Sequence, residues 1–129
     1  MGEALDIART AVRSMIDGDR DALAALLSEN AEWHNSPDFP GASVLRGRPA
    51  IVTFVADFFD DWSHRAFEIE RSAERGDLVV LGLRSRGSGR TSGVPIDVRW
   101  ALTLRTRDGL VTLVHARGEF EKAVKAAGL

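Results

Sequence analysis

Cysteine and tyrosine are both absent from the 129 residues of the chain. The lack of cysteine excludes disulfide frameworks, zinc sites with thiolate ligands and cysteine nucleophiles. The lack of tyrosine removes the phenol as a catalytic group. Long apolar runs are missing too: none approaches the roughly 18 residues that a membrane span needs, and the N-terminus lacks the apolar segment of a signal peptide. We therefore expect a soluble, cytoplasmic protein with no membrane partner.

The charge balance is close to neutral. Lys and Arg total 17 against 19 Asp and Glu, which gives a net charge of -2. This balance argues against a protein that binds nucleic acid. With 44% hydrophobic and 28% charged residues, the composition is that of a folded globular protein and excludes a disordered chain. The length suits one domain over residues 1–129.

Helical periodicity opens the sequence. Apolar residues recur at steps of three and four from Leu5 to Ile16, and Gly18 can end this helix. Asp19 can cap a short second helix that reaches Leu27. A third helix is expected from Pro49, a favoured first-turn residue, to about Trp62. A short final helix is expected over residues 119–127.

Alternating polarity predicts strands in the rest of the chain. Arg75-Gly76-Asp77 and Arg107-Asp108-Gly109 are typical of hairpin turns, and residues 87–93 read as a Gly/Ser-rich connection. The expected strands are residues 31–35, a strand from about residue 67 to the turn at 75–77, and residues 78–88, 94–106 and 110–117.

Helices gather early in this order and strands gather late, which is typical of an α+β fold and not of parallel βαβ units. We expect a cone-shaped, strongly curved sheet, antiparallel or mixed, with the three early helices packed on its concave face. A concavity of this kind is where a pocket with apolar walls and few polar groups usually occurs.

Three stretches of the sequence resemble the SnoaL-like family, a branch of the superfamily of nuclear transport factor and the ketosteroid isomerases. They are Ile16–Asp19 before a short helix, Ala31–Trp33 leading to Arg46–Ile51, and Asp108–Leu110 running to the tail at residues 126–129. Together they cover nearly the whole chain. The resemblance implies the cone-shaped fold but no single activity, because this fold hosts isomerases, cyclases, dehydratases, epoxide hydrolases and noncatalytic binders.

The resemblance also implies that the catalytic positions of the ketosteroid isomerases are not filled as those enzymes require. Their general-base aspartate corresponds to Asn35, whose amide cannot accept a proton at useful pH. Their oxyanion-binding tyrosine corresponds to Ala11, and their protonated aspartate falls near Trp100 or Leu102. Steroid isomerisation by that mechanism is therefore not expected.

Two further catalytic sets of the superfamily are incomplete. Trp33–Asn35 resembles the Tyr-x-Asn motif that positions water in limonene-type epoxide hydrolases, but Leu83 and Ser85 stand at their Arg-x-Asp pair. Ala116 stands at the last aspartate of those hydrolases and near the aspartate of the SnoaL-type polyketide cyclases. The histidine of those cyclases corresponds approximately to Leu102.

Two polar residues remain as candidate catalytic groups. Asn35 shares a strand face with Trp33, so it could orient a carbonyl or a water, or it could bond the following loop. Asp38 lies in that loop and could act as a base if burial raised its pKa, or it could stabilise the turn beside Pro37.

Aromatic and apolar side chains are the candidate substrate contacts. Such residues are more often plain core, but the geometry implied by the resemblance favours a pocket. The predicted contacts are Trp33, Phe54, Phe58, Trp62, Leu83, Val98, Trp100 and Ala116.

No metal or cofactor is expected. His34 and His115 fall out of phase with the pocket residues of their strands, which predicts the outer face, and His64 falls in a connection. These histidines share no ligand spacing. Arg84 and Arg86 read as a solvated strand face, because no aromatic residues lie between them to stack on bases.

We therefore expect a small-molecule pocket protein. It would act by acid–base chemistry without a cofactor on a small, largely apolar, polyketide- or terpenoid-like substrate, as an isomerase, cyclase or hydrolase. The alternative is a noncatalytic ligand-binding or dimerisation module. An apolar strip on the outward parity of the strands predicts a homodimer through the convex face. The strip comprises Val80, Ala101, Thr103, Val111 and Leu113.

Overall fold

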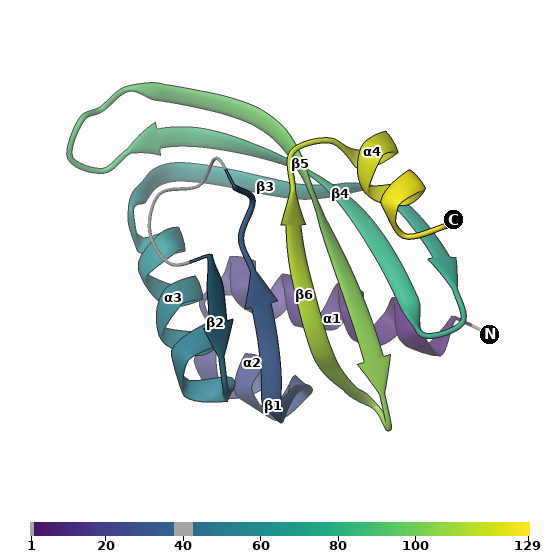
Figure 1. Cartoon of the computed structure of the whole chain (residues 1–129). Helices are drawn as coiled ribbons and strands as arrows, with labels where there is room; N and C mark the ends of the chain where they lie inside the picture. Colours follow the sequence, from purple (N-terminus) through teal and green to yellow (C-terminus); the bar gives the residue numbers. More distant parts are fainter. Residues whose placement is uncertain (1, 38–42) are drawn as a thin grey trace.

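One mixed sheet organises the computed structural model, which describes residues 2–37 and 43–129 (Figure 1). Its strands follow the order β2-β1-β6-β5-β4-β3. In chain order the elements are α1 (Glu3–Asp17), α2 (Arg20–Leu26), β1 (Leu27–His34), β2 (Val44–Arg46), α3 (Arg48–Asp60), β3 (Trp62–Arg75), β4 (Leu78–Gly89), β5 (Pro95–Arg107), β6 (Leu110–Arg117) and α4 (Phe120–Ala126).

The first helix ends and the second helix begins where the sequence predicts. Ala8, Val12 and Met15 form the buried stripe of α1. Gly18 ends that helix with φ 73°, a left-handed conformation that glycine adopts without steric cost, and its N–H bonds the carbonyl of Met15 at 3.3 Å. Asp19 then caps α2 by accepting the N–H of Ala22 at 3.0 Å.

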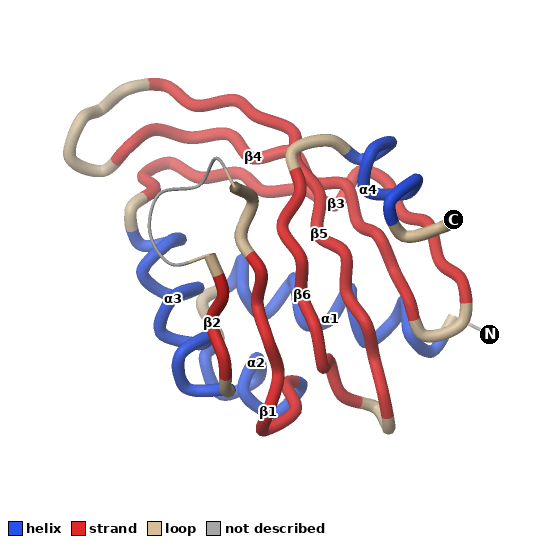
Figure 2. The backbone as a smooth tube through the Cα atoms, viewed as in Figure 1, coloured by secondary structure: helices blue, strands red, loops and turns tan. Residues whose placement is uncertain are grey.

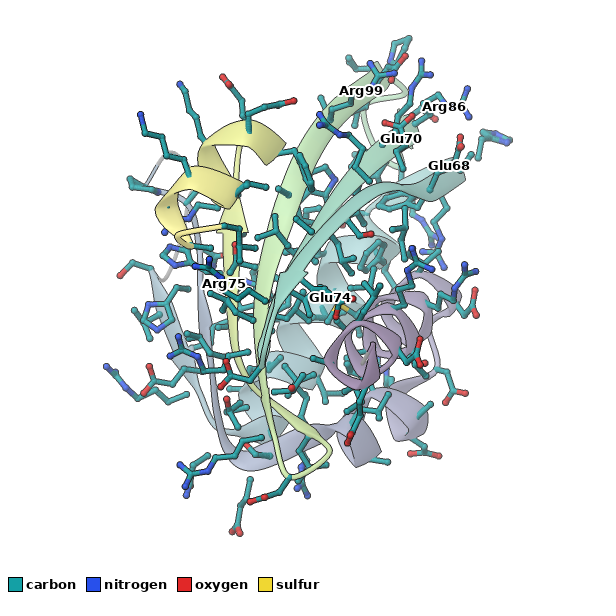
Figure 3. The ribbon with its side chains drawn as sticks, turned by 90° about the vertical axis from the view of Figure 1, so that its right-hand side faces the viewer. Glu68, Glu70, Glu74, Arg75, Arg86 and Arg99 are labelled. Atoms are coloured by element: carbon teal, nitrogen blue, oxygen red, sulfur yellow. The ribbon has the colours of Figure 1, made fainter. Side chains whose placement is uncertain are left out.

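The helices are divided between the two faces of the sheet. Figures 1 and 2 show α1, α2 and α3 together on one side, with the long strands bending over them. The main hydrophobic core fills this side, from Ala8 and Val12 of α1 to Leu81 of β4 and Leu104 of β5. The expected α+β fold, with helices on the concave face of a curved sheet, is confirmed. The short α4 lies on the opposite face (Figure 3).

Strand β1 starts earlier than predicted, and a further strand follows it. Strand β1 begins at Leu27, which the helical stripe had included in the second helix, and the short strand β2 was not expected. Strand β1 pairs in antiparallel fashion with β2 and in parallel with β6, where His34 lies opposite His115. The sheet is therefore mixed, because β1 and β6 come from distant parts of the chain and need no hairpin to join them.

Strands β3 to β6 follow one another in antiparallel fashion and are joined by three hairpin connections. Asp108 and Gly109 both have positive φ in the turn between β5 and β6, as a tight two-residue hairpin requires. Trp62 starts β3 and does not end α3, and β4 continues to Gly89 through residues that had read as a connection. Position 87 of this strand needs glycine, because Ser63 and Trp62 pack so closely on Gly87 that they leave no room for a Cβ.

The prediction of an outward apolar strip as a dimer face is wrong for part of its residues. Val80 and Ala101 are buried beneath Ala123 of α4. Val111 belongs to the main core, because a β-bulge shifts the pairing of β5 with β6 and leaves Thr112 without an opposite residue. Of the strip, Thr103 and Leu113 are half-buried. Among the described residues, no helix combines the length and hydropathy that crossing a bilayer requires.

Candidate functional site

A cavity of about 420 Å³ lies between α3 and the concave face of the sheet. Apolar and aromatic side chains make up most of its wall. The described residues that line it are Met15, Trp33, Asn35, Ser36, Phe54, Val55, Phe58, Phe59, Trp62, Val98, Trp100, Ala116, Arg117 and Gly118. Its size is within the range of about 300–1,000 Å³ that is common for small-molecule sites.

The end of β1 supplies the buried amide of this wall. Strand alternation turns Ala31, Trp33 and Asn35 to the inner face, and all of them are buried. The indole N–H of Trp33 donates to Asn35 Oδ1 at 2.8 Å. The backbone N–H of Asn35 donates to the carbonyl of Ser43 at 2.9 Å, which holds the end of the strand against the start of the next segment. The side-chain amide therefore has a fixed orientation.

A second indole is held on the opposite wall. Trp100 of β5 donates its Nε1–H to Ser85 Oγ of β4 at 2.7 Å, and Ser85 is 0% exposed. Ser85 lies directly opposite Val98 in the pairing of β4 with β5. The polar atoms of this wall are thus bonded to each other, which leaves the faces of the rings toward the cavity apolar.

Phenylalanines of α3 connect the two indoles. Phe54 lies 5.7 Å from the ring of Trp33, and Phe58 lies 6.0 Å from the rings of both Trp62 and Trp100. These centroid distances fall within the range of favourable aromatic pairs. Helical spacing explains the placement, because residues four apart on α3 face the same way. The result is a continuous aromatic wall around the cavity.

The structure brings most of the predicted site residues together. Trp33, Asn35, Phe54, Phe58, Trp62, Val98, Trp100 and Ala116 all line the cavity. Leu83 does not: it is 1% exposed and is buried in the core, where α1 and the sheet meet. The predicted base Asp38 lies outside the described residues.

Several lining residues were missed by the sequence reasoning. Phe59 and Val55 lie four apart on α3, so extending the helical stripe from Val55 would have found Phe59. Met15 comes from α1, and Arg117 and Gly118 come from the end of β6. No local pattern identifies these, because they reach the cavity only through the tertiary arrangement of distant elements.

Arg117 is the one residue among the described lining set whose side chain is charged. Its guanidinium lies 3.3 Å from His115 Nδ1. Both residues alternate with Ala116 along β6, yet Arg117 also lines the cavity, and its buried Nε has no hydrogen-bond partner among the described residues. The described part of the wall is therefore mostly apolar, with the polar side chains of Asn35 and Ser36 and the charged side chain of Arg117.

Two histidines lie side by side on the outer face, as their parity predicts. The rings of His34 and His115 are 5.5 Å apart, and His34 Nε2 lies 2.9 Å from Glu32 Oε1. That bond lowers the pKa of Glu32. Burial, followed by the charge of Arg117 and by His34, lowers the pKa of His115. Within the described residues, no three His, Asp or Glu side chains are arranged as ligands for a metal ion.

The positions that matter in related enzymes bear chemically inert side chains here. Ala116 has no group that transfers protons, and Ser85 is committed to the indole of Trp100. What the described wall can do is exclude water, enclose an apolar molecule and orient one polar atom of that molecule. Acid–base chemistry would need a group from outside the described lining residues.

Comparisons with known proteins agree with this geometry. The sequence profile of the SnoaL-like domain matches residues 8–114. No curated protein sequence matches the chain.

Several solved structures are similar to this chain over most of their length. An NTF2-like protein from Burkholderia thailandensis E264 has a TM-score of 0.78 at 22% identity, covering 96% of each chain. A Bacillus subtilis protein assigned as an isomerase has a TM-score of 0.76 at 20% identity, covering 98% of this chain and 93% of its own. A Jannaschia sp. CCS1 protein assigned as a SnoaL-like polyketide cyclase has a TM-score of 0.75 at 18% identity, covering 93% and 90%. At these identities the likeness shows the fold alone.

Proposed function

The chain belongs to the family of SnoaL-like domains, and from that premise we propose that its aromatic cavity binds a small, largely apolar molecule carrying a hydrogen-bond acceptor such as a carbonyl oxygen. The volume of about 420 Å³ suits a compound of terpenoid or small polyketide size. Burying such a molecule against aromatic walls removes apolar surface from water, which is favourable by about 25 cal/mol per Å².

The contact between Trp33 and Asn35 is the observation that carries this proposal. The indole N–H of Trp33 donates to Asn35 Oδ1 at 2.8 Å, so the buried amide has a fixed orientation at the wall of the cavity. An amide fixed in this way favours a ligand that carries a polar atom at the matching position. Asn35 is only 8% exposed, so little water competes for the hydrogen bonds that its amide makes, and these bonds are stronger than on the surface.

We propose further that the protein acts on this ligand as an isomerase, cyclase or hydrolase by acid–base chemistry without a cofactor. Asn35 would polarise the carbonyl, and Asp38 would transfer the proton. The activities assigned to the Bacillus subtilis and Jannaschia proteins support the reaction class. The role of Asp38 rests on the sequence alone.

A noncatalytic ligand-binding module is the second candidate. The composition of the wall favours it, because the described lining residues include no Asp, Glu or His. The two candidates share the cavity and Asn35, and they differ in whether a proton is transferred.

Binding is tested first. A thermal-shift screen of terpenoid- and polyketide-like ketones, followed by calorimetry on the best stabiliser, should identify a ligand. Asn35→Ala should lower the affinity for that ligand about tenfold, because it removes one hydrogen bond of about 1.4 kcal/mol. Trp33→Phe keeps an aromatic ring in the wall but removes the indole N–H that fixes the amide, so it should cause a smaller loss. Unchanged affinity in folded Asn35→Ala protein would contradict the proposal.

Turnover separates the two candidates. Each stabiliser is incubated with the protein and followed by mass spectrometry and chromatography. If the protein is an enzyme, Asp38→Asn should abolish product formation and leave the affinity for the ligand close to that of the unaltered chain. Ligands that bind tightly but are never converted would favour the noncatalytic module.

A further inference from the structure

The β4–β5 hairpin extends beyond β6, with β3 still paired to the outer side of β4. Pairing of β5 with β6 stops at Ala101 opposite Arg117, whereas pairing of β5 with β4 continues to Pro95 opposite Ser88, and pairing of β4 with β3 continues to Gly89 opposite Trp62. We call residues 84–89 and 95–100 the arm. Figure 1 shows the arm projecting past the ends of β1 and β6, on the side where α3 lies. Its inner face continues the concave face that carries the cavity.

The outer face of the arm is a ladder of ion pairs. Arg84 bonds Asp97 at 3.1 and 2.9 Å. Arg99 bonds Glu70 of β3 at 2.9 Å. Arg86 bonds Glu68 of β3. Figure 3 shows the two pairs that reach β3, Arg86 with Glu68 and Arg99 with Glu70, gathered at this end of the sheet. Each of these groups has a partner within the chain, so the outer face is a solvated surface that needs no ligand.

The inner face of the arm is apolar by contrast. Trp100, Val98 and Ile96 alternate with the charged residues of β5, and Val94 continues the row just before the strand. Opposite Val98 and Ile96 on β4 stand Ser85 and Gly87. The indole of Trp62 packs closely against Gly87, so a further apolar ring flanks the row at this position.

Two members of this row are unusually exposed. Val94 is 58% and Val98 is 45% exposed, and these are the large hydrophobic side chains with that exposure among the described residues. Val98 and Trp100 also line the cavity. The exposed row thus starts inside the site and leads out of it, so its apolar surface is continuous with the surface that would bind the ligand.

We propose that this row, Val98, Ile96 and Val94, is a subsite for the apolar tail of an elongated ligand whose acceptor end lies at Asn35. The inference rests on the proposed function and names its substrate class: a carbonyl compound with a linear aliphatic chain. Ile96 lies four steps along β5 from Trp100, a path of about 13 Å at the rise of a strand. That path matches a chain of roughly eight to ten carbons, which would cover the valines and remove them from water.

Two ketones test the subsite. Methyl butyl ketone fits the cavity alone, and methyl nonyl ketone adds five methylenes that would lie on the row. Calorimetry should find the nonyl compound about 30-fold tighter, since partial burial contributes about twofold per methylene. Ile96→Ser should remove most of this difference and leave the affinity for the butyl compound unchanged. Asp97→Ser, one residue along on the outer face, is the matched control and should keep the full difference.

The outcomes separate this inference from the proposed function. Binding of both ketones with equal affinity, or a difference that survives in folded Ile96→Ser protein, would overturn the subsite and leave the cavity proposal standing. If neither ketone binds, both proposals fail together. If Ile96→Ser instead changes the mass in sedimentation, a second copy covers the row and the subsite is overturned. Val94→Ser, at the far end of the row, should reduce the difference less than Ile96→Ser does.

Discussion

Thr103 carries a buried hydroxyl with no hydrogen-bond partner among the described residues. Leaving a buried polar group unpaired costs about 1 to 3 kcal/mol, and valine has nearly the same shape without that group. Thr103→Val should therefore raise the free energy of unfolding by about 1 kcal/mol in urea denaturation. Thr112→Val is the control, since its exposed hydroxyl bonds the carbonyl of Arg105 at 3.3 Å. The control should change stability by less than about 0.5 kcal/mol.

His115 should make stability depend on pH near neutrality. Burial, Arg117 and His34 all disfavour its cation in the fold and lower its pKa. The unfolded chain therefore takes up this proton first, so stability is full above about pH 6.5 and is lost as pH falls toward the folded pKa. His115→Gln should flatten the dependence of unfolding free energy between about pH 7.5 and pH 5.

The pH range of the loss of stability identifies the group that causes it. The lowered pKa values of Glu32, Asp97 and Glu121 place their titration at more acidic pH. An equally steep loss of stability between pH 7.5 and 5 in His115→Gln protein would show that another group is responsible.

Residue-level patterns predicted the orientation of side chains better than their roles. Alternation along residues 31–35 placed Trp33 and Asn35 correctly on the inner face, since polarity follows the pleat. It could not foresee that the indole of Trp33 bonds the amide two residues on, because that depends on rotamers. The same limit applied to Ser85 and Trp100, which come from different strands.

At the scale of elements, α4 packs on the outer face through a close contact. A Cβ at Gly82 of β4 would lie 2.9 Å from the ring of Phe120 and 3.3 Å from Arg71 Cβ. The guanidinium of Arg71 lies over the same ring at 4.3 Å, so the ring cannot move freely. Gly82→Ala should therefore lower the free energy of unfolding by about 1 to 3 kcal/mol, measured by chemical denaturation.

Gly118→Ala provides the comparison for this substitution. A Cβ there meets nothing within 4 Å, so its effect should stay within about 0.5 kcal/mol. Because the unfolded-chain effect of Gly→Ala is stabilising at both positions, an equal loss of stability at the two glycines would contradict the contact with α4 as its cause.

Elements defined by long periodic patterns were predicted well, and short or irregular ones were not. The stripe of α1 and the turns at Gly76 and Gly109 have clear local causes. Strand β2 spans only Val44–Arg46, too short for alternation to be visible, and its position depends on pairing with β1. The bulge near Thr112 changed the parity of β6, so Val111 was assigned to the wrong face.

At the scale of the whole molecule, we propose a homodimer through the outer face of the sheet. α4 covers part of the expected strip, so Leu113 on β6 is the apolar residue of that strip on which the test depends. Leu113→Glu would bury a charge in the interface and should convert the dimer to a monomer in sedimentation at micromolar concentration. Val94→Glu, which places the same charge at the tip of the arm, should keep the mass of the dimer. A monomeric unaltered chain would contradict the proposal.

The curved sheet with helices inside it could be predicted as a whole, because the order of elements and the family resemblance pointed to the same fold. The cavity followed from that fold, and all but one of the predicted substrate contacts lie along its wall, while their role in binding stays a prediction. Leu83 was assigned to the wall because parity gives the face of a strand but not the depth of a side chain. Met15 and Arg117 were missed because no spacing links α1 to the end of β6.

The parallel pairing of β1 with β6 has a consequence for the order in which the molecule can assemble. Leu27 lies opposite Val111, so β1 finds its central neighbour only after residues 28–110 have been synthesised. Until then β1 and β2 form an isolated pair, which is marginally stable in water. The helices α1, α2 and α3 precede β4 and β5 in the chain, so their apolar stripes stay uncovered until those strands form, and pairing β1 with β6 requires the slow closure of a long loop. Strand β6 thus completes the sheet over a cavity whose aromatic lining residues all precede it in the chain.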